Sequence, residues 1–356
     1  MQPPVLPLRS DFTAEEIEYI IRDDPAPVLS GGLELIDLNL EMEEDLTADF
    51  FGGSVTRVAT NTLHGTAQLA LGRELDWGNS LVRPYLLMSG ARFNLGAYYA
   101  SVPSTTVQGN PTIFGIEGYD ILHRLTDRVG EAYSVAAGTA PLDAVETIIA
   151  TQGILRYFID PIRRDITLPS AIVWPLDNNT TWLTIVNNLL ESVGYEHIWS
   201  DWDGKLQCVP IVAPRDRGAE WTYTGDIDTS QLALDRTIKR DLFDAPNRWR
   251  AVRQNNIDGA TPVEGAGIYT YVNYSTGPTS VEARGGRVIT APLISIDAAD
   301  QAALVAAVQA QSALDMAMPT TIEVALPIPN PRHWHNDRVH STDEGLGGLH
   351  ECLVTS

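Results

Sequence analysis

The spacing of apolar residues separates β-rich stretches of this chain from helical ones. Residues 30–118 carry short apolar runs divided by turns, and no helical period there exceeds two turns. This pattern predicts a β-barrel or β-sandwich. The expected strands are 33–40, 54–60, 65–75, 81–88 and 92–101.

A short helix and a linker precede this block and make up residues 1–29. Thr13 and Glu16 have the spacing of a capping box, and Ile17 then opens a run of isoleucines at helical spacing. Asp23-Asp24-Pro25 ends the helix. We interpret the segment as an arm that docks on a neighbouring protein, the alternative being a frayed terminus.

Residues 119–213 have a helical period and close on a β-hairpin. Helices are expected at 119–125, 141–151 and 181–193, where apolar residues recur at three- and four-residue spacing. The hairpin joins 195–199 to 205–212 through Asp201-Trp202-Asp203-Gly204, because Asp-Gly favours a tight turn. The segment is interpreted as a smaller α/β domain.

In residues 214–356 the sequence pattern again predicts strands, together with one alanine-rich helix at 297–316. The expected strands are 221–224, 233–238, 247–254, 267–274, 287–289 and 322–326, with closing strands around Val339 and at 352–354. The whole chain is therefore predicted to be α+β, with two β-rich domains flanking the α/β domain.

Composition adds a strong negative charge to this picture. The 356 residues hold 46 acidic and 24 basic side chains, a net charge of −22, and residues 1–50 alone contribute −11. Such a surface argues against free binding to nucleic-acid backbones or anionic lipids. No stretch has the length and hydrophobicity of a membrane span. The simpler interpretation is an acidic surface that is only solvated. The more specific interpretation is a negative surface that prevents a polyanion from binding.

Histidines near the C-terminus are the weak candidates for a metal site. His333, His335 and Asp337 lie close together and His340 follows, and alternation places the first two on one strand face. Zinc needs three or four converging ligands, and this spacing is incomplete. We therefore expect no metal and no other cofactor.

Catalytic motifs are similarly absent from the sequence. It contains no Gly-x-Ser-x-Gly elbow, no His-Glu-x-x-His and no phosphate-binding loop. Cys208 lies in an expected strand, where a small buried side chain is the usual role. Paired carboxylates such as Asp201 and Asp203, or Glu43 and Glu44, could in principle serve a glycoside hydrolase, but aspartates that flank a hairpin turn are ordinary turn residues. We expect the chain not to be an enzyme.

The order of several motifs between residue 112 and about 340 resembles phage tail-tip and baseplate hub proteins. In siphophages these are minor tail proteins or the N-terminal hub part of tail-associated lysins. The motifs are Thr112–Leu122, Ala140–Val145, Thr181–Leu190 with Gly194-Tyr195, Trp202–Leu206 with Pro210, Asp241–Asn247, and Pro329–His333 with Asp337–Val339. None of them is catalytic, and their shared order carries the resemblance.

The resemblance implies a structural protein of the virion rather than an enzyme. In this family two tube-protein-like β-barrels flank an α/β domain, so a homotrimer forms a pseudo-hexameric ring that matches the six-fold tail tube. The expected domains are 1–29, 30–118, 119–213 and 214–356. The expected neighbours are the tail tube or distal tail protein, the tape measure protein, and tip or fibre proteins.

DNA in this family passes through the assembly during ejection, so acidic residues between 34 and 49 are expected to repel it in transit. The protein would be assembled in the host cytoplasm, without stable membrane insertion. The family's later segment, often a peptidoglycan hydrolase or a fibre-binding region, has no counterpart before Ser356. The alternatives are a distal tail or receptor-binding adaptor, and a cell-wall-degrading enzyme that uses Asp201 and Asp203.

Overall fold

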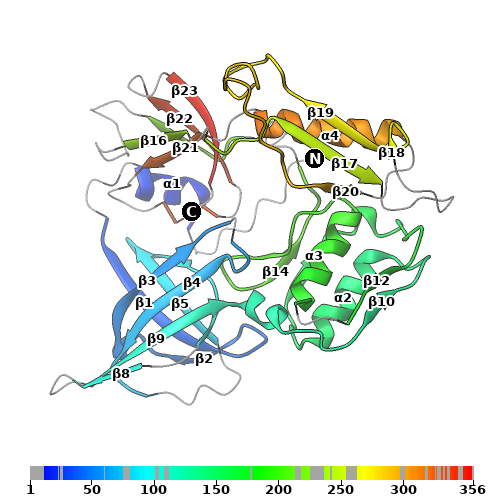
Figure 1. Cartoon of the computed structure of the whole chain (residues 1–356). Helices are drawn as coiled ribbons and strands as arrows, with labels where there is room; N and C mark the ends of the chain where they lie inside the picture. Colours follow the sequence, from blue (N-terminus) through cyan, green and yellow to red (C-terminus); the bar gives the residue numbers. More distant parts are fainter. Residues whose placement is uncertain are drawn as a thin grey trace. The chain divides into compact units, whose positions relative to one another are not determined.

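Figure 1 shows the computed structural model of the chain, which is mixed α+β and dominated by strands. The residues that the structure describes are 12–22, 24, 27–59, 61–74, 81–100, 104–107, 112–176, 179–212, 218–224, 236–240, 243–253, 263–296, 301–316, 320–324, 326, 330–331, 333–334, 337–343 and 348–354. The chain divides into two compact units, residues 1–231 with 326–356 and residues 232–325, and each is described by itself.

The N-terminal helix α1 (Ala14–Arg22) is capped as its sequence predicts. The backbone N and Oγ1 of Thr13 donate to Glu16 Oε2 at 2.7 and 2.9 Å, and Glu16 N donates back to Thr13 Oγ1 at 3.2 Å. The three isoleucines of the helix are buried. The predicted helix and its capping box are confirmed.

A nine-stranded antiparallel sheet follows in the first unit. Its strands are β1 (Leu29–Ile36), β2 (Met42–Asp45), β3 (Phe50–Arg57), β4 (Gly65–Leu71), β5 (Leu81–Met88), β6 (Ala91–Asn94), β7 (Tyr98–Ala100), β8 (Ser104–Val107) and β9 (Thr112–Asp120), and the 3-10 turn η1 (Thr47–Asp49) precedes β3. The main order is β2-β1-β5-β7-β9-β4-β3, while β6 pairs with β5 and β8 pairs with β9.

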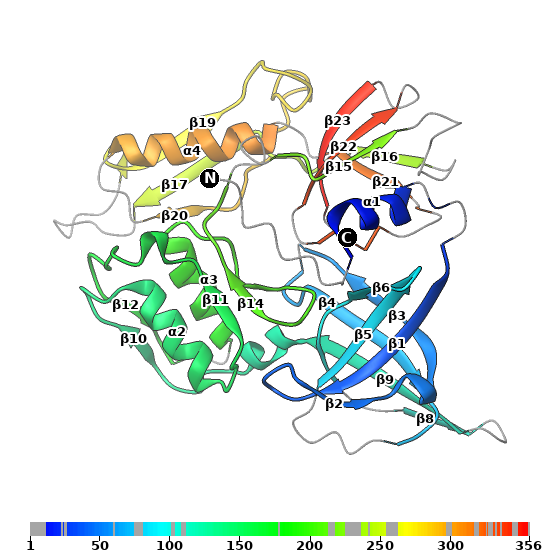
Figure 2. The same ribbon diagram turned by 180° about the vertical axis from the view of Figure 1, so that it is seen from behind.

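The ribbon of this sheet is strongly curved in both views (Figures 1 and 2). Leu33, Leu69, Val82, Tyr98 and Ile116 are buried together on its inner side. The predicted barrel or sandwich is therefore realised as a curved sheet. In the part of the chain that the structure describes, its hydrogen-bonded path is open and ends at β2 and β3.

The predicted strand 92–101 is wrong at its centre, because two of its backbone groups bond elsewhere. Leu95 N donates to Pro84 O at 2.9 Å, and Gly96 N donates to Trp202 O at 2.8 Å. Gly96 also has φ = +107°, a conformation that breaks a strand and favours glycine. The strand 81–88 is confirmed at both ends.

The predicted helix at 119–125 is instead the end of β9 followed by the 3-10 helix η2 (Ile121–Thr126). Asp120 Oδ1 accepts a hydrogen bond from Leu122 N at 3.1 Å and caps the helix. The helix is short because Asp127 has an extended backbone, so the apolar spacing does not continue into further turns.

Helices α2 (Pro141–Thr151) and α3 (Trp182–Ser192) pack against each other and confirm the two central helices predicted. Thr181 caps α3 by accepting from Thr184 N at 3.2 Å. Their apolar faces share a core with Leu81 of β5. This shared core joins the helical segment to the nine-stranded sheet.

Short strands flank these helices. They are β10 (Tyr133–Val135) paired with β12 (Ile172–Trp174), and β11 (Tyr157–Ile159), which runs parallel to β14 (Leu206–Cys208), itself antiparallel to β13 (Trp199–Ser200); η3 (Pro161–Arg163) follows β11. The predicted hairpin is confirmed with shorter strands than expected.

The first unit also contains a sheet that joins distant parts of the chain. Strand β15 (Trp221–Thr224) runs parallel to β22 (Arg338–Asp343), which pairs antiparallel with β23 (Gly348–Leu353). Both closing strands predicted near the C-terminus are confirmed. These two strands belong to the first unit, whereas residues 232–325 form the second unit. The assignment of residues 214–356 to one tube-like domain therefore stays a prediction.

The second unit is a four-stranded sheet covered on one face by α4 (Gln301–Met316). Its strands are β18 (Val263–Glu264), β19 (Gly267–Val272), β17 (Arg248–Arg253) and β20 (Ile294–Ile296), and a separate pair joins β16 (Arg236–Arg240) to β21 (Thr320–Val324). Trp249 and Ala251 of β17 pack with Leu304 and Val308 of α4.

The predicted strand 287–289 is wrong, because Ile289 O accepts from the backbone N of Asn247 and of Arg248 as part of a loop. The predicted helix 297–316 is described from Gln301 onward, and residues 297–300 lie outside the described residues. Among the described helices, none combines the length and the apolar character that spanning a bilayer requires.

Candidate functional site

A pocket of about 430 Å³ lies between α1 and the turn that joins β5 to β6. Two hydrogen bonds tie the turn to the segment that follows the helix. Ser89 Oγ donates to Asp24 Oδ2 at 2.9 Å, and Ser89 N donates to Val28 O at 2.8 Å. Ser89 also has φ = +47°, so the turn takes a left-handed conformation beside the pocket.

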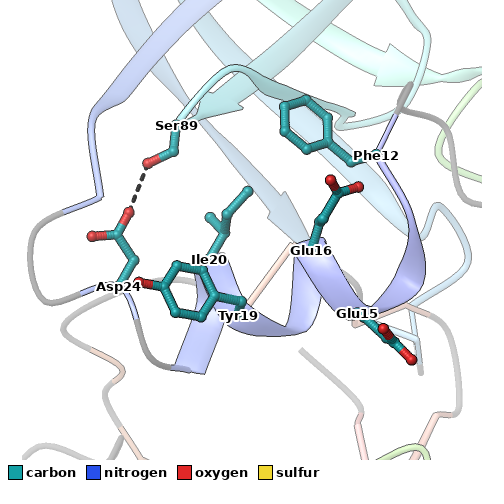
Figure 3. A pocket seen from close by; sticks show the side chains of 7 residues that line it. All are labelled: Phe12, Glu15, Glu16, Tyr19, Ile20, Asp24 and Ser89. Atoms are coloured by element: carbon teal, nitrogen blue, oxygen red, sulfur yellow. Dashed lines mark hydrogen bonds between the residues drawn. The ribbon is translucent and has the colours of Figure 1, made fainter.

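The lining of this pocket combines carboxylates with apolar surface (Figure 3). Glu16 and Asp24 stand at opposite ends, Ile20 lies between them, and the Glu15 side chain is directed away from the others. Tyr19 is 57% exposed at the rim. None of the seven lining residues carries a positive charge, so the pocket offers a mainly apolar, partly aromatic surface with carboxylates at its edges.

The acidic segment 34–49 is partly neutralised by arginines of the same unit. Glu44 and Asp49 lie 2.5 and 2.8 Å from Arg73, and Glu41 lies 3.2 Å from Arg156. These pairs are solvent-exposed and each contributes little to stability. Their effect is to reduce the local field that the composition alone would predict.

Glu34 in this segment does not face solvent. Its Oε2 accepts from Arg83 Nε and Nη2 at 3.0 and 2.8 Å, and its Oε1 accepts from Arg92 Nη1 at 2.6 Å. Burial by itself raises the pKa of this carboxyl, but the two arginines outweigh burial and lower it below the ordinary value of 4.5. Glu34 is a structural charge of the sheet rather than a surface acid.

A line of polar contacts runs from Glu34 to the hairpin turn of the helical segment. Arg92 Nε donates to Asn94 Oδ1 at 3.0 Å, and Asn94 Nδ2 donates to Asp203 Oδ1 at 2.8 Å. A Cβ on Gly204 would lie 2.3 Å from Ala97 Cβ, so the turn fits closely against the sheet. The turn residues therefore position the helical segment on the sheet.

The two carboxylates considered for glycoside hydrolysis are buried in this contact. Asp201 Oδ1 accepts from the backbone N of Asp203 and of Lys205 at 3.0 and 2.9 Å, and Oδ2 accepts from Gln207 Nε2 at 2.9 Å. Burial, and then the charge of Asp203, raise the pKa of Asp201. With one oxygen bonded by the turn and the other by Gln207 of β14, Asp201 acts as a structural residue here.

The histidine candidates do not converge in the described part of the chain. His333 Nε2 lies within hydrogen-bond reach of the Tyr223 hydroxyl, and His333 Nδ1 is 3.8 Å from Asp337 Oδ2. His340 is on β22, opposite Glu351 of β23, and His335 lies outside the described residues. Within the described residues, no three metal-binding side chains come together as a group.

Trp334 connects three parts of the first unit that are far apart in sequence. Its Nε1 donates to Ser200 O at 3.0 Å, its ring meets Trp202 edge-on at 5.9 Å, and the Arg57 guanidinium lies 3.8 Å from its ring centroid. Arg57 Nη2 also donates to Ser200 O at 3.0 Å. The sequence carries no signal that places Arg57 at this contact.

Two buried ionisable groups, His64 and Asp120, lie beside this junction. Asp120 Oδ2 accepts from Gly65 N at 2.8 Å. Burial, only partly offset by the charge of Arg57, raises the pKa of Asp120 to about 6. Burial, followed by the charge of Arg57, lowers the pKa of His64 to about 4. Each group is therefore held toward its neutral form.

These opposite shifts predict a pH-dependent difference between the wild type and His64→Gln. Between its ordinary pKa of 6.5 and about 4, only the unfolded chain protonates His64, so acid destabilises the fold. Asp120 acts in the other direction, because the folded state holds its proton up to about pH 6. Relative to the wild type, the free energy of unfolding of His64→Gln should therefore rise by about 2 kcal/mol between about pH 7.5 and about pH 5.

Urea unfolding of both proteins at the two pH values measures this change. A free-energy difference between variant and wild type that is the same at both pH values would contradict the prediction. His123→Gln, the same substitution at an exposed histidine, is the matched control.

No protein-family model matches the chain, and no curated protein matches it. Solved structures do. A tail protein from Neisseria meningitidis MC58 superposes with a TM-score of 0.65 at 14% identity, over 92% of this chain and 90% of that one. The 43 kDa tail protein of prophage MuSo2 from Shewanella oneidensis gives 0.60 at 13% identity, over 92% and 93%.

A third solved structure, prophage tail protein gp18 from Listeria monocytogenes EGD-e, gives a TM-score of 0.51 at 16% identity, over 91% of this chain and 89% of that one. At these identities the comparisons concern the fold. All three extend over nearly the full length of both chains. The chain thus resembles phage tail proteins and has their fold.

Proposed function

We propose that this protein is a structural hub of a phage tail tip, a homotrimer that joins the tail tube to distal tip proteins. The observation that carries the proposal is the agreement in fold with the Neisseria tail protein over 92% of the chain. The similarity extends over nearly the full length of both chains. It therefore argues for the same kind of tail component, because a single shared domain would match only one segment.

The proposed hub is a ring built from two tube-like domains and an α/β domain in each copy. The curved nine-stranded sheet supports the first tube-like domain, since it encloses an apolar core and leaves strands β2 and β3 at its edges. Edge strands are protected when a neighbouring chain covers them. A closed ring of identical copies provides such a neighbour.

DNA passage through the ring is the second element of the proposal. Exposed acids such as Glu43 and Asp45 on β2 suit a surface along which a polyanion slides without binding. Glu34 is excluded from that task because Arg83 and Arg92 neutralise it inside the sheet. The proposed repulsion therefore depends on fewer acids than residues 34–49 contain.

The proposed partners follow from this role. They are a tail tube or distal tail protein on one side, and tape measure, tip and fibre proteins on the other. The protein would reside in the virion after assembly in the host cytoplasm. A distal tail or receptor-binding adaptor is the alternative structural role. A cell-wall-degrading enzyme is less favoured, because the oxygens of Asp201 are occupied by its own turn and by Gln207.

Native mass measurement of the purified full chain tests the proposal. We expect a stable trimer and no clearing of cell walls, and a three-fold density at the tip of the tail in electron micrographs of the virion. A monomer at all concentrations, or a ring of another order, would contradict the hub. Clearing of cell walls that is lost in Asp201→Asn would instead support the enzyme.

A further inference from the structure

Nearly every described lysine or arginine side chain is already engaged by its own chain. Arg128, Arg248 and Arg250 are the exceptions, since within the described residues their side chains make no hydrogen bond, ion pair or ring contact. Two of these three lie on β17 in the second unit. The chain has only 24 basic residues, and two of them lie on one strand without such a contact. Their side chains are therefore available to bind another molecule.

The two arginines share one face of the sheet. Trp249 and Ala251 point toward α4, so alternation places Arg248, Arg250 and Val252 on the opposite face. Their cross-strand neighbours on β19 are Val272, Thr270 and Ile268. Arg250 is exposed, so this face presents a guanidinium among small and apolar side chains.

The two units of the chain differ sharply in charge. Residues 232–325 hold 8 basic and 10 acidic residues, a net charge of −2, and the remaining residues therefore carry −20. An arginine on the nearly neutral unit is attracted to the acidic unit of any copy that it meets. DNA would also attract these arginines, but the net charge of −22 repels it from the whole chain.

The pocket at α1 has the chemistry that receives an arginine side chain. Glu16 and Asp24 supply negative charge at its two ends, and Tyr19 supplies an aromatic face for a guanidinium (Figure 3). Ile20 forms an apolar floor against which the aliphatic stem can pack. At one end of the pocket, a hydrogen bond from Ser89 Oγ fixes the Asp24 carboxylate.

We propose that the α1 pocket of one copy receives the Arg250 side chain from the exposed β17 face of a neighbouring copy. This inference rests on the proposed ring. A closed ring uses two different surfaces on each subunit, and each must complement the other. The acidic pocket and the arginine face are such a pair, because they lie on different units of the chain and carry opposite charge.

The test measures the dissociation constant of the assembled protein by mass photometry at low salt. Arg250→Glu places a negative charge against the pocket, and Tyr19→Arg fills the pocket with its own guanidinium. Each single change should weaken assembly by about tenfold or more. Arg250→Glu sets a carboxylate against the acids of the pocket, and Tyr19→Arg occupies the pocket and competes with Arg250 for those acids. The combined variant, Tyr19→Arg with Arg250→Glu, should recover assembly to within about threefold of wild type.

Two control variants make the same charge changes elsewhere. Arg128→Glu alters an exposed arginine without a partner, and Ala150→Arg adds a cation to the exposed surface of α2. Both should assemble like the wild type. Circular dichroism of all variants establishes that they are folded, and Tyr19→Ala provides a milder change at the pocket.

A mixture of the two single variants adds a geometric check. In any ring of three, at least two neighbours are of the same kind, so every ring of the mixture contains one mismatched interface. The mixture should therefore assemble more weakly than the combined variant, in which all three interfaces are matched.

The outcomes separate the inference from the function on which it rests. If the wild type is a trimer and both single variants remain trimers of unchanged affinity, the inference is wrong and the hub stands. If the single variants lose thermal stability while assembly is unchanged, Arg250 contacts its own chain and the inference is also wrong. A wild type that never assembles overturns the hub itself.

Discussion

Glu34→Gln is expected to lower the free energy of unfolding of the first unit by about 3 kcal/mol. The change removes the carboxylate that neutralises Arg83 and Arg92, and it leaves their positive charges uncompensated inside the sheet. Glu34 is 4% exposed, so water cannot replace the lost partner. Urea unfolding followed by circular dichroism measures the effect.

The destabilisation by Glu34→Gln should depend on pH in a known direction. The folded protein holds the pKa of Glu34 below 4.5, so its contribution is complete above that pH and fades as pH falls through the lowered value. Wild type and variant should therefore converge in acid. Glu131→Gln, at an exposed acid, is the control, and an equal loss in both variants would contradict the buried ion pairs.

Trp334→Ala is expected to cost about 3–5 kcal/mol and to loosen the C-terminal strands of the first unit. The change leaves a cavity at a side chain that is 7% exposed, and it removes the ring contacts of Trp202 and Arg57. Denaturant unfolding gives the free energy. Limited proteolysis followed by mass spectrometry should show faster cleavage after residue 325.

Trp334→Phe separates packing from hydrogen bonding at this junction. Phenylalanine retains an aromatic ring and loses the Nε1 donor to Ser200 O, so we expect a cost of only about 1–2 kcal/mol. Arg57→Met should act through the same contact, and its effect should be smaller in the Trp334→Ala background. Additive effects of the two changes would show that Arg57 and Trp334 are not coupled.

Local patterns predicted the helices well, for a physical reason. The capping box at Thr13, the proline that opens α2 and the threonine cap of α3 are signals within one turn of the helix that they specify. An apolar stripe requires only that some hydrophobic core lies on that side of the helix. The stripe therefore predicts the helix without specifying what the helix packs against. Strand 81–88 was predictable in the same way, from a bounded apolar run.

Strand ends near the junction were not predictable, because distant residues decide them. Gly96 leaves the strand to donate to Trp202 O, a partner more than a hundred residues away. Asp120 ends β9 by capping η2, which local spacing extended into a helix. The edge strand β2 is wholly exposed and acidic, so it lacks the alternating pattern by which strands are recognised.

The candidate site also combines features that nearby residues determine with features that distant residues determine. The acidic character of the arm was visible in the sequence, but the pocket depends on the turn at Ser89, 65 residues from the Asp24 that it bonds. The histidine cluster was visible as well, and tertiary contacts turned His333 toward Tyr223 and Asp337. The resemblance to tail proteins came from motif order, and the fold supports it.

The sequence alone determined the α+β composition, the two central helices, the capped arm and the net charge of −22. These properties are sums over residues or depend on neighbours within a few positions. Only the tertiary structure decided which charges act at the surface. It pairs Glu34 with two arginines inside the sheet and leaves Arg250 exposed, because ion pairing depends on distances of a few ångströms between residues that are far apart in the chain.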